Sequence, residues 1–191
     1  MKQNSRTSTP SLTPPVMDAE AINRALRRIA HEITERNPEL ASVVLAGIPS
    51  RGVEIARRLA GIIESLSQTA IGSGVIDVSM HRDDVGKRAE LPRVQASSLP
   101  LPLENKTVII VDDVFFTGRT ARAAMDAINS YGRPARIQLA ALIDRGHREL
   151  PIRVDYVGKN LPTAAGERVR LRLENVDGEP DAVWLIKEEK A

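Results

Sequence analysis

The stretch VIIVDDVFFTGRT at residues 108–120 decides the fold class of this chain. The run from Thr107 to Val111 is apolar without alternation, which is typical of a parallel strand covered on both faces. Two acids, Asp112 and Asp113, follow at its carboxyl end, and a small polar loop then opens a helix over about 120–131. Ligands of open α/β sheets bind beyond the carboxyl ends of the strands, so the stretch predicts a parallel sheet with a binding site.

The loop after the two acids has the chemistry of a phosphate site. A helix N-terminus offers backbone N–H groups and the positive end of the helix dipole, and both favour an anion. Thr117, Gly118 and Thr120 add hydroxyl groups and close backbone approach. Asp112 and Asp113 would repel a phosphate unless they accept hydrogen bonds from ribose hydroxyls or help to hold Mg²⁺. We therefore expect a phosphorylated ribose here; the plain alternative is an acidic strand end with an ordinary helix cap. The sequence contains neither GxxxxGK[ST] nor GxGxxG.

Strand and helix patterns alternate on both sides of this stretch. A helix is predicted over about 18–36, with Asp18 as N-cap and Asn37-Pro38 as its end. Strand 43–46, the turn 47–52, helix 53–64, strand 75–80 and a long loop at 81–103 follow. Further strands are predicted at 137–143, 156–157, 169–173 and 183–186. This order predicts an open, mainly parallel sheet flanked by helices.

Composition excludes several classes of protein. The 191 residues contain no cysteine, so disulfides and thiolate metal sites are excluded, and the three histidines lack metal-ligand spacing. Residues 1–16 are rich in Ser, Thr and Pro and predict a disordered tail rather than a signal peptide; residues 17–191 then form a single domain. No apolar run is long enough to cross a membrane, and a cytoplasmic location follows. The formal charge of +2 is too small to imply a nucleic-acid partner without a local basic face.

The first predicted helix carries such a face. Ile22, Leu26, Ile29 and Ile33 recur at helical spacing and form its apolar side. The opposite side is basic, and its residues are Arg24, Arg27, Arg28 and His31. A solvated helix surface is the plain alternative.

Residues 108–120 resemble the phosphoribosyl pyrophosphate (PRPP) motif of type I phosphoribosyltransferases. Four further blocks resemble the pyrimidine operon attenuation proteins of the PyrR family: RALRRIAHEITERN at 24–37, the turn at 47–52, Arg82-Asp83-Asp84, and DRGHRELPIRVDYVGKNLPT at 144–163. That family combines an RNA-binding regulator with a uracil phosphoribosyltransferase. The resemblance covers about residues 17–187, and the block at 144–163 is its most discriminating part.

The resemblance implies a fold and a set of nucleotide-site residues. The fold is a type I phosphoribosyltransferase-like sheet with a small hood of C-terminal strands. Asp112 and Asp113 would hold the ribose hydroxyls and help to hold Mg²⁺, and Arg82 would close over the substrate. The pyrophosphate loop would be Ser50, Arg51 and Gly52. The 5′-phosphate would be wrapped by Val114, Phe115, Phe116, Thr117, Gly118, Arg119 and Thr120. Arg145 and Val169 would border the uracil or its ribose.

The implied RNA-binding face joins the basic side of the first helix to the later block. Its residues are Arg24, Arg27, Arg28, His31, His147, Arg148, Arg153 and Lys159. Arg27 departs from the family pattern, which often has a small hydroxyl residue there. Other departures are Phe115-Phe116 in place of Leu-Tyr, His81 in place of Tyr, and Ala164-Ala165-Gly166 in place of a more polar stretch. They concern loop closure and base recognition.

The sequence thus predicts a UMP-dependent regulator that binds the leader mRNA of pyrimidine genes and also converts uracil and PRPP into UMP and diphosphate. Mg²⁺ would accompany PRPP, no side chain is named as catalytic base, and a homodimer or larger homo-oligomer is implied. A salvage uracil phosphoribosyltransferase with no RNA role is the alternative. A purine phosphoribosyltransferase is a third reading, against which the block at 144–163 argues.

Overall fold

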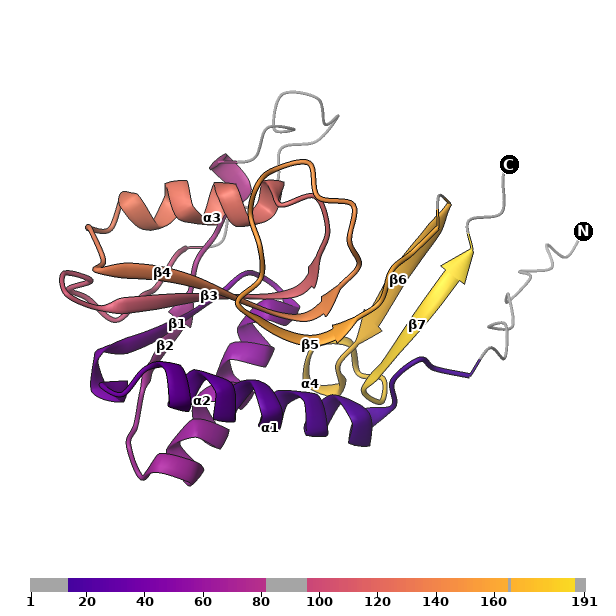
Figure 1. Ribbon diagram of the computed structural model, residues 1–191, viewed down its shortest axis with the longest axis horizontal. Helices are drawn as coiled ribbons and strands as arrows, with labels where there is room; N and C mark the ends of the chain where they lie inside the picture. Colours follow the sequence, from indigo (N-terminus) through magenta and orange to yellow (C-terminus); the bar gives the residue numbers. More distant parts are fainter. Residues whose placement is uncertain (1–13, 82–95, 165, 188–191) are drawn as a thin grey trace, which may run out of the picture.

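The computed structural model describes residues 14–81, 96–164 and 166–187 and is built around a five-stranded parallel sheet (Figure 1). Along the chain the elements are α1 (Ala19–Arg36), η1 (Leu40–Ser42), β1 (Val43–Gly47), α2 (Arg51–Ser67), β2 (Gly72–Val75), η2 (Ser79–His81), β3 (Thr107–Phe115), α3 (Arg119–Asn129), β4 (Arg136–Asp144), β5 (Tyr156–Asn160), β6 (Glu167–Arg172), α4 (Glu174–Asp177) and β7 (Ala182–Lys187). The strand order is β2-β1-β3-β4-β5. Helices α1 and α2 cover one face of the sheet and α3 covers the other. The predicted fold class is confirmed.

Each face of the sheet has its own apolar core. Ile109 and Val111 of β3 are fully buried among residues of α1 and α2, such as Leu26. Val108 and Ile110 are fully buried on the other side, against alanines of α3. Because successive strand residues point to opposite faces, an unbroken apolar run is what this two-sided burial requires.

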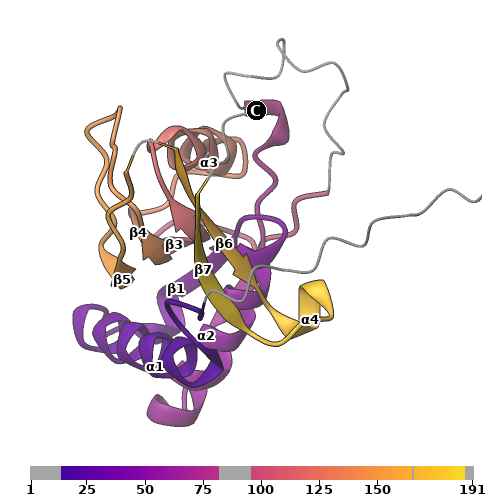
Figure 2. The ribbon, with the colours of Figure 1, turned by 90° about the vertical axis from the view of Figure 1, so that its right-hand side faces the viewer.

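A separate antiparallel ribbon, β6–β7, forms the hood beside the sheet (Figure 2). Its inner side chains, including Leu171 and Val183, join the core under α1. The segment before α1 is attached to it, because Val16 donates to the Val183 carbonyl oxygen at 2.7 Å. Residues 1–13 of the predicted tail lie outside the described residues, and the division into a tail and one domain stays a prediction.

Two predicted strand boundaries are wrong. β3 continues through Asp112 to Phe115, because β4 supplies partners for these residues as far as Asp144. β2 covers Gly72–Val75 rather than 75–80, since β1 ends at Gly47, opposite Val75. The other helices and strands lie within a few residues of their predicted bounds, and Asp18 caps α1 as predicted.

Among the described residues, no helix combines the length and the hydropathy that crossing a membrane requires. The long loop predicted at 81–103 falls mainly on 82–95, outside the described residues. From its described part, Ser98 forms an antiparallel bridge with Val75.

Candidate nucleotide site at the carboxyl edge of the sheet

Two loops meet at the point where the strand-to-helix connections change from one face of the sheet to the other. β1 is followed by α2 on one face, and its neighbour β3 is followed by α3 on the other. Adjacent strands whose connections leave on opposite faces create a crevice at their carboxyl ends, which is where open α/β sheets bind ligands. The β1–α2 loop holds the predicted pyrophosphate loop, and the β3–α3 loop holds the predicted phosphate loop. The tertiary structure therefore brings together two predicted segments that lie more than 60 positions apart in the chain.

The β1–α2 loop lies directly against β3. Ile48 donates to the Val111 carbonyl oxygen at 2.9 Å. Gly52 lies so close to Val111 that a side chain could not be accommodated, since a Cβ at position 52 would be 2.4 Å from the same oxygen. Gly47 is similarly confined, with a Cβ position 2.5 Å from the Val53 Cα. These contacts hold the N-terminus of α2 beside the two acids of β3.

Asp112 and Asp113 are strand residues with different exposure. Asp112 is 8% exposed, and one of its carboxylate oxygens accepts from the Asp113 amide at 2.9 Å. The Asp113 side chain is 26% exposed, and its Oδ1 accepts from the Val114 amide at 2.9 Å. Asp113 is the more accessible acceptor for a ribose hydroxyl.

The phosphate loop is bound along its length by residues 145–150. Arg145 donates from its amide to the Phe115 carbonyl oxygen at 3.1 Å, and Glu149 and Leu150 donate to that of Thr117 at 2.9 and 3.2 Å. Gly118 precedes α3 with φ +91°, a left-handed conformation that favours glycine. Gly118 offers no side-chain cap, and the Arg119 amide at the start of α3 donates to the Thr117 hydroxyl at 3.4 Å, so the helix N-terminus faces this loop, the place where open α/β folds bind anions.

Arg51 is paired with a residue that sequence reasoning missed. Its Nε and Nη2 donate to the two carboxylate oxygens of Asp177, in α4, at 3.0 and 2.7 Å. Its Nη1 lies 3.9 Å from Asp113 Oδ2. The hydrogen bond from Arg51 is the main reason that the pKa of Asp177 lies well below its usual range. Asp177 lies 126 residues from Arg51 in the chain, and no local motif links them.

A cluster of aromatic and cationic side chains lies between the phosphate loop and the hood. The Arg145 guanidinium lies 3.9 Å from the centre of the Phe116 ring, and His147 contacts the same ring edge-on at 5.8 Å between ring centres. Arg145 also donates to the Thr163 hydroxyl at 3.2 Å and to the Glu167 carbonyl oxygen at 2.8 Å. Phe116 is 40% exposed, so its ring can receive a planar ligand. Phe115, in contrast, is buried in the core beneath α3.

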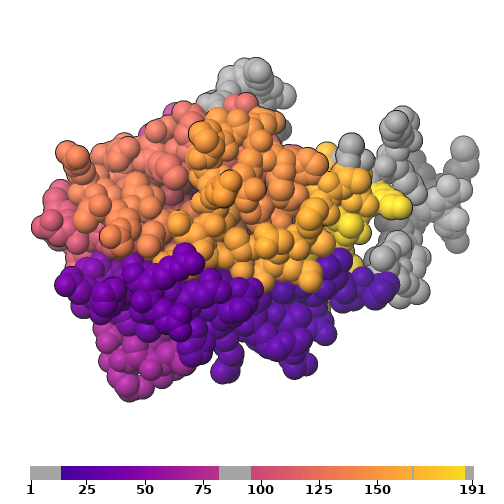
Figure 3. Space-filling model, in the orientation of Figure 1, coloured from indigo at the N-terminus to yellow at the C-terminus, as the bar shows by residue number. Residues whose placement is uncertain are grey.

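The predicted RNA-binding residues fall into two groups. Arg24 and Arg28 of α1 and Lys159 of β5 line one shallow hollow. Arg28 joins the two elements, because its Nη2 donates to the carbonyl oxygens of Gly158 and Val157 at 2.5 and 3.0 Å. Figure 3 shows α1 and the segment 145–160 as one continuous surface on this side of the molecule. Arg27 and His31 are exposed on α1, as predicted, and Arg153 is exposed before β5.

The second group lies beside the phosphate loop. His147 contacts Phe116, and its Nε2 lies 2.6 Å from the Thr163 carbonyl oxygen. Arg148 donates to the buried Asp144 carboxylate at 2.5 Å and lies over the Phe115 ring. The segment 144–163 therefore reaches from the nucleotide site to the basic face of α1.

Two predicted site residues are not placed in the crevice by the described part of the structure. Arg82 lies outside the described residues, and Val169 packs on the core under the ribbon. In the described part of the chain, no cluster of three or more His, Asp or Glu side chains could hold a metal ion. Asp112 and Asp113 alone suit a metal that arrives with its own oxygen ligands, such as Mg²⁺ on a diphosphate.

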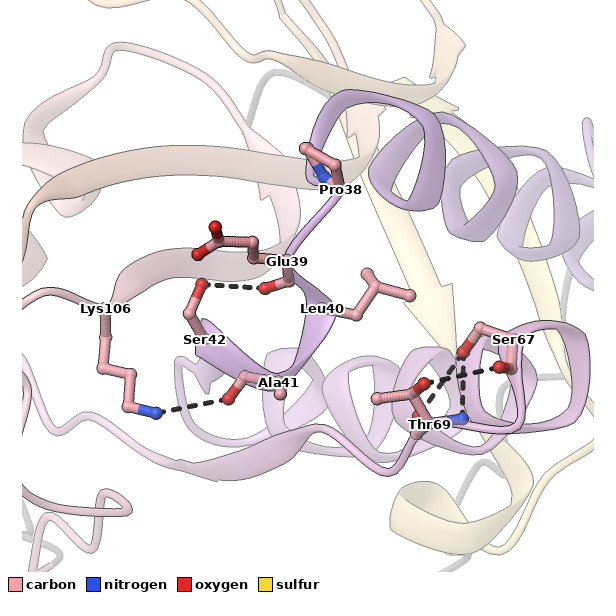
Figure 4. Close-up of a pocket in the computed structure, with 8 residues that line it drawn as sticks. All are labelled: Pro38, Glu39, Leu40, Ala41, Ser42, Ser67, Thr69 and Lys106. Carbon is pink, nitrogen blue, oxygen red and sulfur yellow. Dashed lines mark hydrogen bonds between the residues drawn. The ribbon is translucent and has the colours of Figure 1, made fainter.

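A hollow at the amino ends of β1 and β3 is lined by η1, the end of α2 and Lys106 (Figure 4). Two of its polar side chains bond to backbone: Ser42 donates to the Glu39 carbonyl oxygen at 2.7 Å, and Lys106 to that of Ala41 at 3.2 Å. These bonds close the amino ends of β1 and β3. The crevice at the carboxyl ends remains the candidate site.

Comparisons with known proteins show the family to which the chain belongs. Residues 16–172 match the family model of the phosphoribosyl transferase domain. A bifunctional protein PyrR from Chloroflexus aurantiacus is 56% identical over 170 residues, covering 89% of this chain and 93% of its own. One from Roseiflexus sp. is 51% identical over 172 residues, covering 90% and 94%. Among solved structures, a Leishmania tarentolae HGPRT-ase in complex with GMP has a TM-score of 0.72 at 17% identity, covering 95% of this chain and 100% of its own. A Staphylococcus aureus hypoxanthine phosphoribosyltransferase has a TM-score of 0.64 at 22% identity, covering 83% and 81%. These two structures bear on the fold alone.

Proposed function

Since the chain belongs to the PyrR family of phosphoribosyltransferases, we propose that it converts uracil and PRPP into UMP and diphosphate and that it binds leader mRNA of pyrimidine genes in response to UMP. One observation carries the proposal: two helix N-termini and the partly exposed Asp113 meet at the switch point of the sheet. This arrangement offers one place for the 5′-phosphate of PRPP, one for its diphosphate, and an acceptor for the ribose between them.

The transfer forms a bond from uracil nitrogen to the anomeric carbon and breaks the bond from that carbon to the diphosphate oxygen. Positive charge develops on the ribose and negative charge on the leaving group. Asp113, with Asp112, would orient the ribose hydroxyls, so that proximity supplies much of the rate. Arg51 and the amides of Ser50 to Gly52 would stabilise the departing diphosphate by preorganised electrostatics. Mg²⁺ bound to the diphosphate would neutralise part of its charge, with Asp112 and Asp113 as its protein contacts.

Base recognition would fall to the cluster around Phe116. The exposed ring can stack on a planar pyrimidine, and Arg145 is held beside it by Thr163 and Glu167. The uracil loses a proton as the new bond forms, and no side chain of the described residues is assigned as its acceptor.

The proposed response to UMP has a physical route. The segment 144–163 contacts Phe116 and Thr117 at one end and Arg28 at the other. A nucleotide that orders the phosphate loop would therefore also order the carbonyl oxygens that hold Arg28. Since coupling between two ligands is reciprocal, RNA would tighten UMP binding by the same factor as UMP tightens RNA binding. The basic faces would combine in a homodimer or larger assembly, and both roles belong to the cytoplasm.

One experiment tests both parts. Binding of a pyrimidine-gene leader RNA is measured with and without UMP at two salt concentrations, and conversion of uracil is compared with that of hypoxanthine. We expect tighter RNA binding with UMP, weaker binding at high salt, and turnover of uracil alone. Turnover without RNA binding would leave a salvage enzyme, and preference for hypoxanthine would overturn the assignment of the base.

A further inference from the structure

The Asp177 carboxylate holds one edge of the Arg51 guanidinium. Two parallel hydrogen bonds run from Nε and Nη2 to its two oxygens, at 3.0 and 2.7 Å. A guanidinium is planar and presents its N–H groups in a fixed fork, so two such bonds determine the orientation of the whole group. The remaining nitrogen, Nη1, faces Asp113 at 3.9 Å.

Asp177 is itself rigidly placed. Its side chain is 7% exposed, and it also accepts from Arg172 Nη1 and from the Leu173 amide, both at 2.8 Å. Residues near Asp177 are bonded to α2, the helix that contains Arg51. Asn175 donates to Glu54 at 2.7 Å, and Asp181 pairs with Arg58. The carboxylate is therefore a fixed point from which Arg51 projects toward the crevice.

We propose that Asp177 is a positioning residue that orients Arg51 so that its Nη1 edge meets the diphosphate of the substrate. The inference rests on the proposed function. A diphosphate between the start of α2 and Asp113 meets the Nη1 edge of Arg51 without breaking the pair with Asp177. The hood thus sets the geometry of the diphosphate site, although no residue of the ribbon or of α4 touches the reacting atoms.

The test is Asp177→Asn in the full chain. Asparagine has the same shape and can still accept from the Leu173 amide, but it cannot accept two parallel bonds from Arg51. We expect the Kd for Mg²⁺-diphosphate, measured by calorimetry, and the KM for PRPP to rise about tenfold, the effect of losing roughly one charge-assisted hydrogen bond. UMP has no diphosphate, so its Kd is expected to stay within about twofold.

Two further variants separate positioning from stability of the hood. Arg172→Gln removes the other cation bonded to Asp177 and leaves Arg51 paired; it is expected to keep diphosphate affinity. In an Arg51→Lys background, Asp177→Asn is expected to have no further effect, because lysine cannot form the paired bonds. An equal loss in Arg172→Gln, or a full effect in the Arg51→Lys background, would overturn the proposal.

The remaining outcomes are also decisive. Unchanged or tighter diphosphate binding in Asp177→Asn would mean that Asp177 only competes for Arg51, and the proposal would be wrong. If the wild type binds diphosphate but does not convert uracil, the proposed function fails while this test still applies. If the wild type binds no diphosphate, the pyrophosphate-loop assignment and the positioning role both fail.

Discussion

Gly52 lies against the carbonyl oxygen of Val111, so that a Cβ at position 52 would be 2.4 Å from that oxygen. Val111 immediately precedes the two acids of β3, and Gly52 belongs to the first turn of α2. This contact determines how near the start of α2 comes to Asp113. It explains physically why a glycine is needed where the two halves of the proposed PRPP site meet.

Replacement of this glycine is therefore expected to open the site. Gly52→Ala forces α2 away from β3, at a cost typical of overpacking, about 1–3 kcal/mol, and should raise the Kd for diphosphate at least several-fold. Gly61→Ala is the matched control in the same helix, since a Cβ at position 61 has nothing within 4 Å. Removing a glycine from a helix interior should raise stability by about 0.5–1 kcal/mol. Chemical denaturation measures the stability of each variant, and calorimetry measures its Kd for diphosphate. An unchanged diphosphate affinity in Gly52→Ala would contradict the expectation.

If Asp113 binds the ribose hydroxyls, its replacement should weaken the binding of both the substrate PRPP and the product UMP. Asp113→Asn removes the charge from the more exposed of the two carboxylates and should weaken both PRPP and UMP, each about tenfold or more. Binding of free diphosphate, which has no ribose, should change much less. Titration of the three ligands checks this pattern. Full turnover and unchanged affinity in the variant would show that the assigned role is wrong.

Glu54 predicts how stability depends on pH. Hydrogen bonds from Arg57, Asn175 and Arg58 lower the pKa of its carboxyl group from 4.5 to about 2. A lowered pKa means that the stabilisation is complete above pH 4.5 and is lost as pH falls toward 2. Glu54→Gln should therefore be less stable than the wild type by about 2 kcal/mol at neutral pH, and this difference should shrink below pH 4.5.

Denaturant unfolding from pH 7 to pH 3.5 measures this difference directly. Glu64→Gln, an exposed residue on the same helix, controls for the loss of one negative charge. A difference that is constant down to pH 3.5 would argue against the ionised network around Glu54.

The proposed RNA face predicts a change in salt dependence. Arg27 is exposed in the middle of the basic side of α1. Arg27→Ala should weaken leader RNA binding several-fold and reduce the salt slope by about one, while the melting temperature stays nearly unchanged. Arg133→Ala removes the same charge from the exposed turn between α3 and β4 and serves as control. Equal losses in the two variants would indicate a general charge effect instead of a defined face.

The proposed stacking of the base on Phe116 predicts that removal of this ring weakens binding of uracil and UMP. Phe116→Ala removes the ring that Arg145 and His147 contact, and should raise the KM for uracil and the Kd for UMP. A stacking contact contributes about 1–3 kcal/mol, which corresponds to roughly 5- to 150-fold. Phe116→Tyr keeps the ring and should keep both values. If Phe116→Ala binds UMP normally, the base lies elsewhere.

The class of fold and the main motif could be predicted because both depend on local sequence. The apolar run before Asp112 specifies a strand buried on both faces, and the loop after it specifies a helix start with room for an anion. For the same reason, the sequence predicted Asp18 as the cap of α1 and the burial of its four isoleucine and leucine positions. The end of β3 and the start of β2 were not, since a strand continues only as far as its neighbour supplies partners.

By itself, the sequence determined which residues belong to the motif, that the sheet is parallel, and that α1 has a basic side, because each of these follows from residue type and spacing. Only the tertiary structure decided that Asp177 holds Arg51, that Gly52 meets Val111, and that Arg28 is tied to Gly158. The physical reason is that such contacts join side chains and backbone far apart in the chain. Their geometry exists only after the sheet, the helices and the hood have packed together.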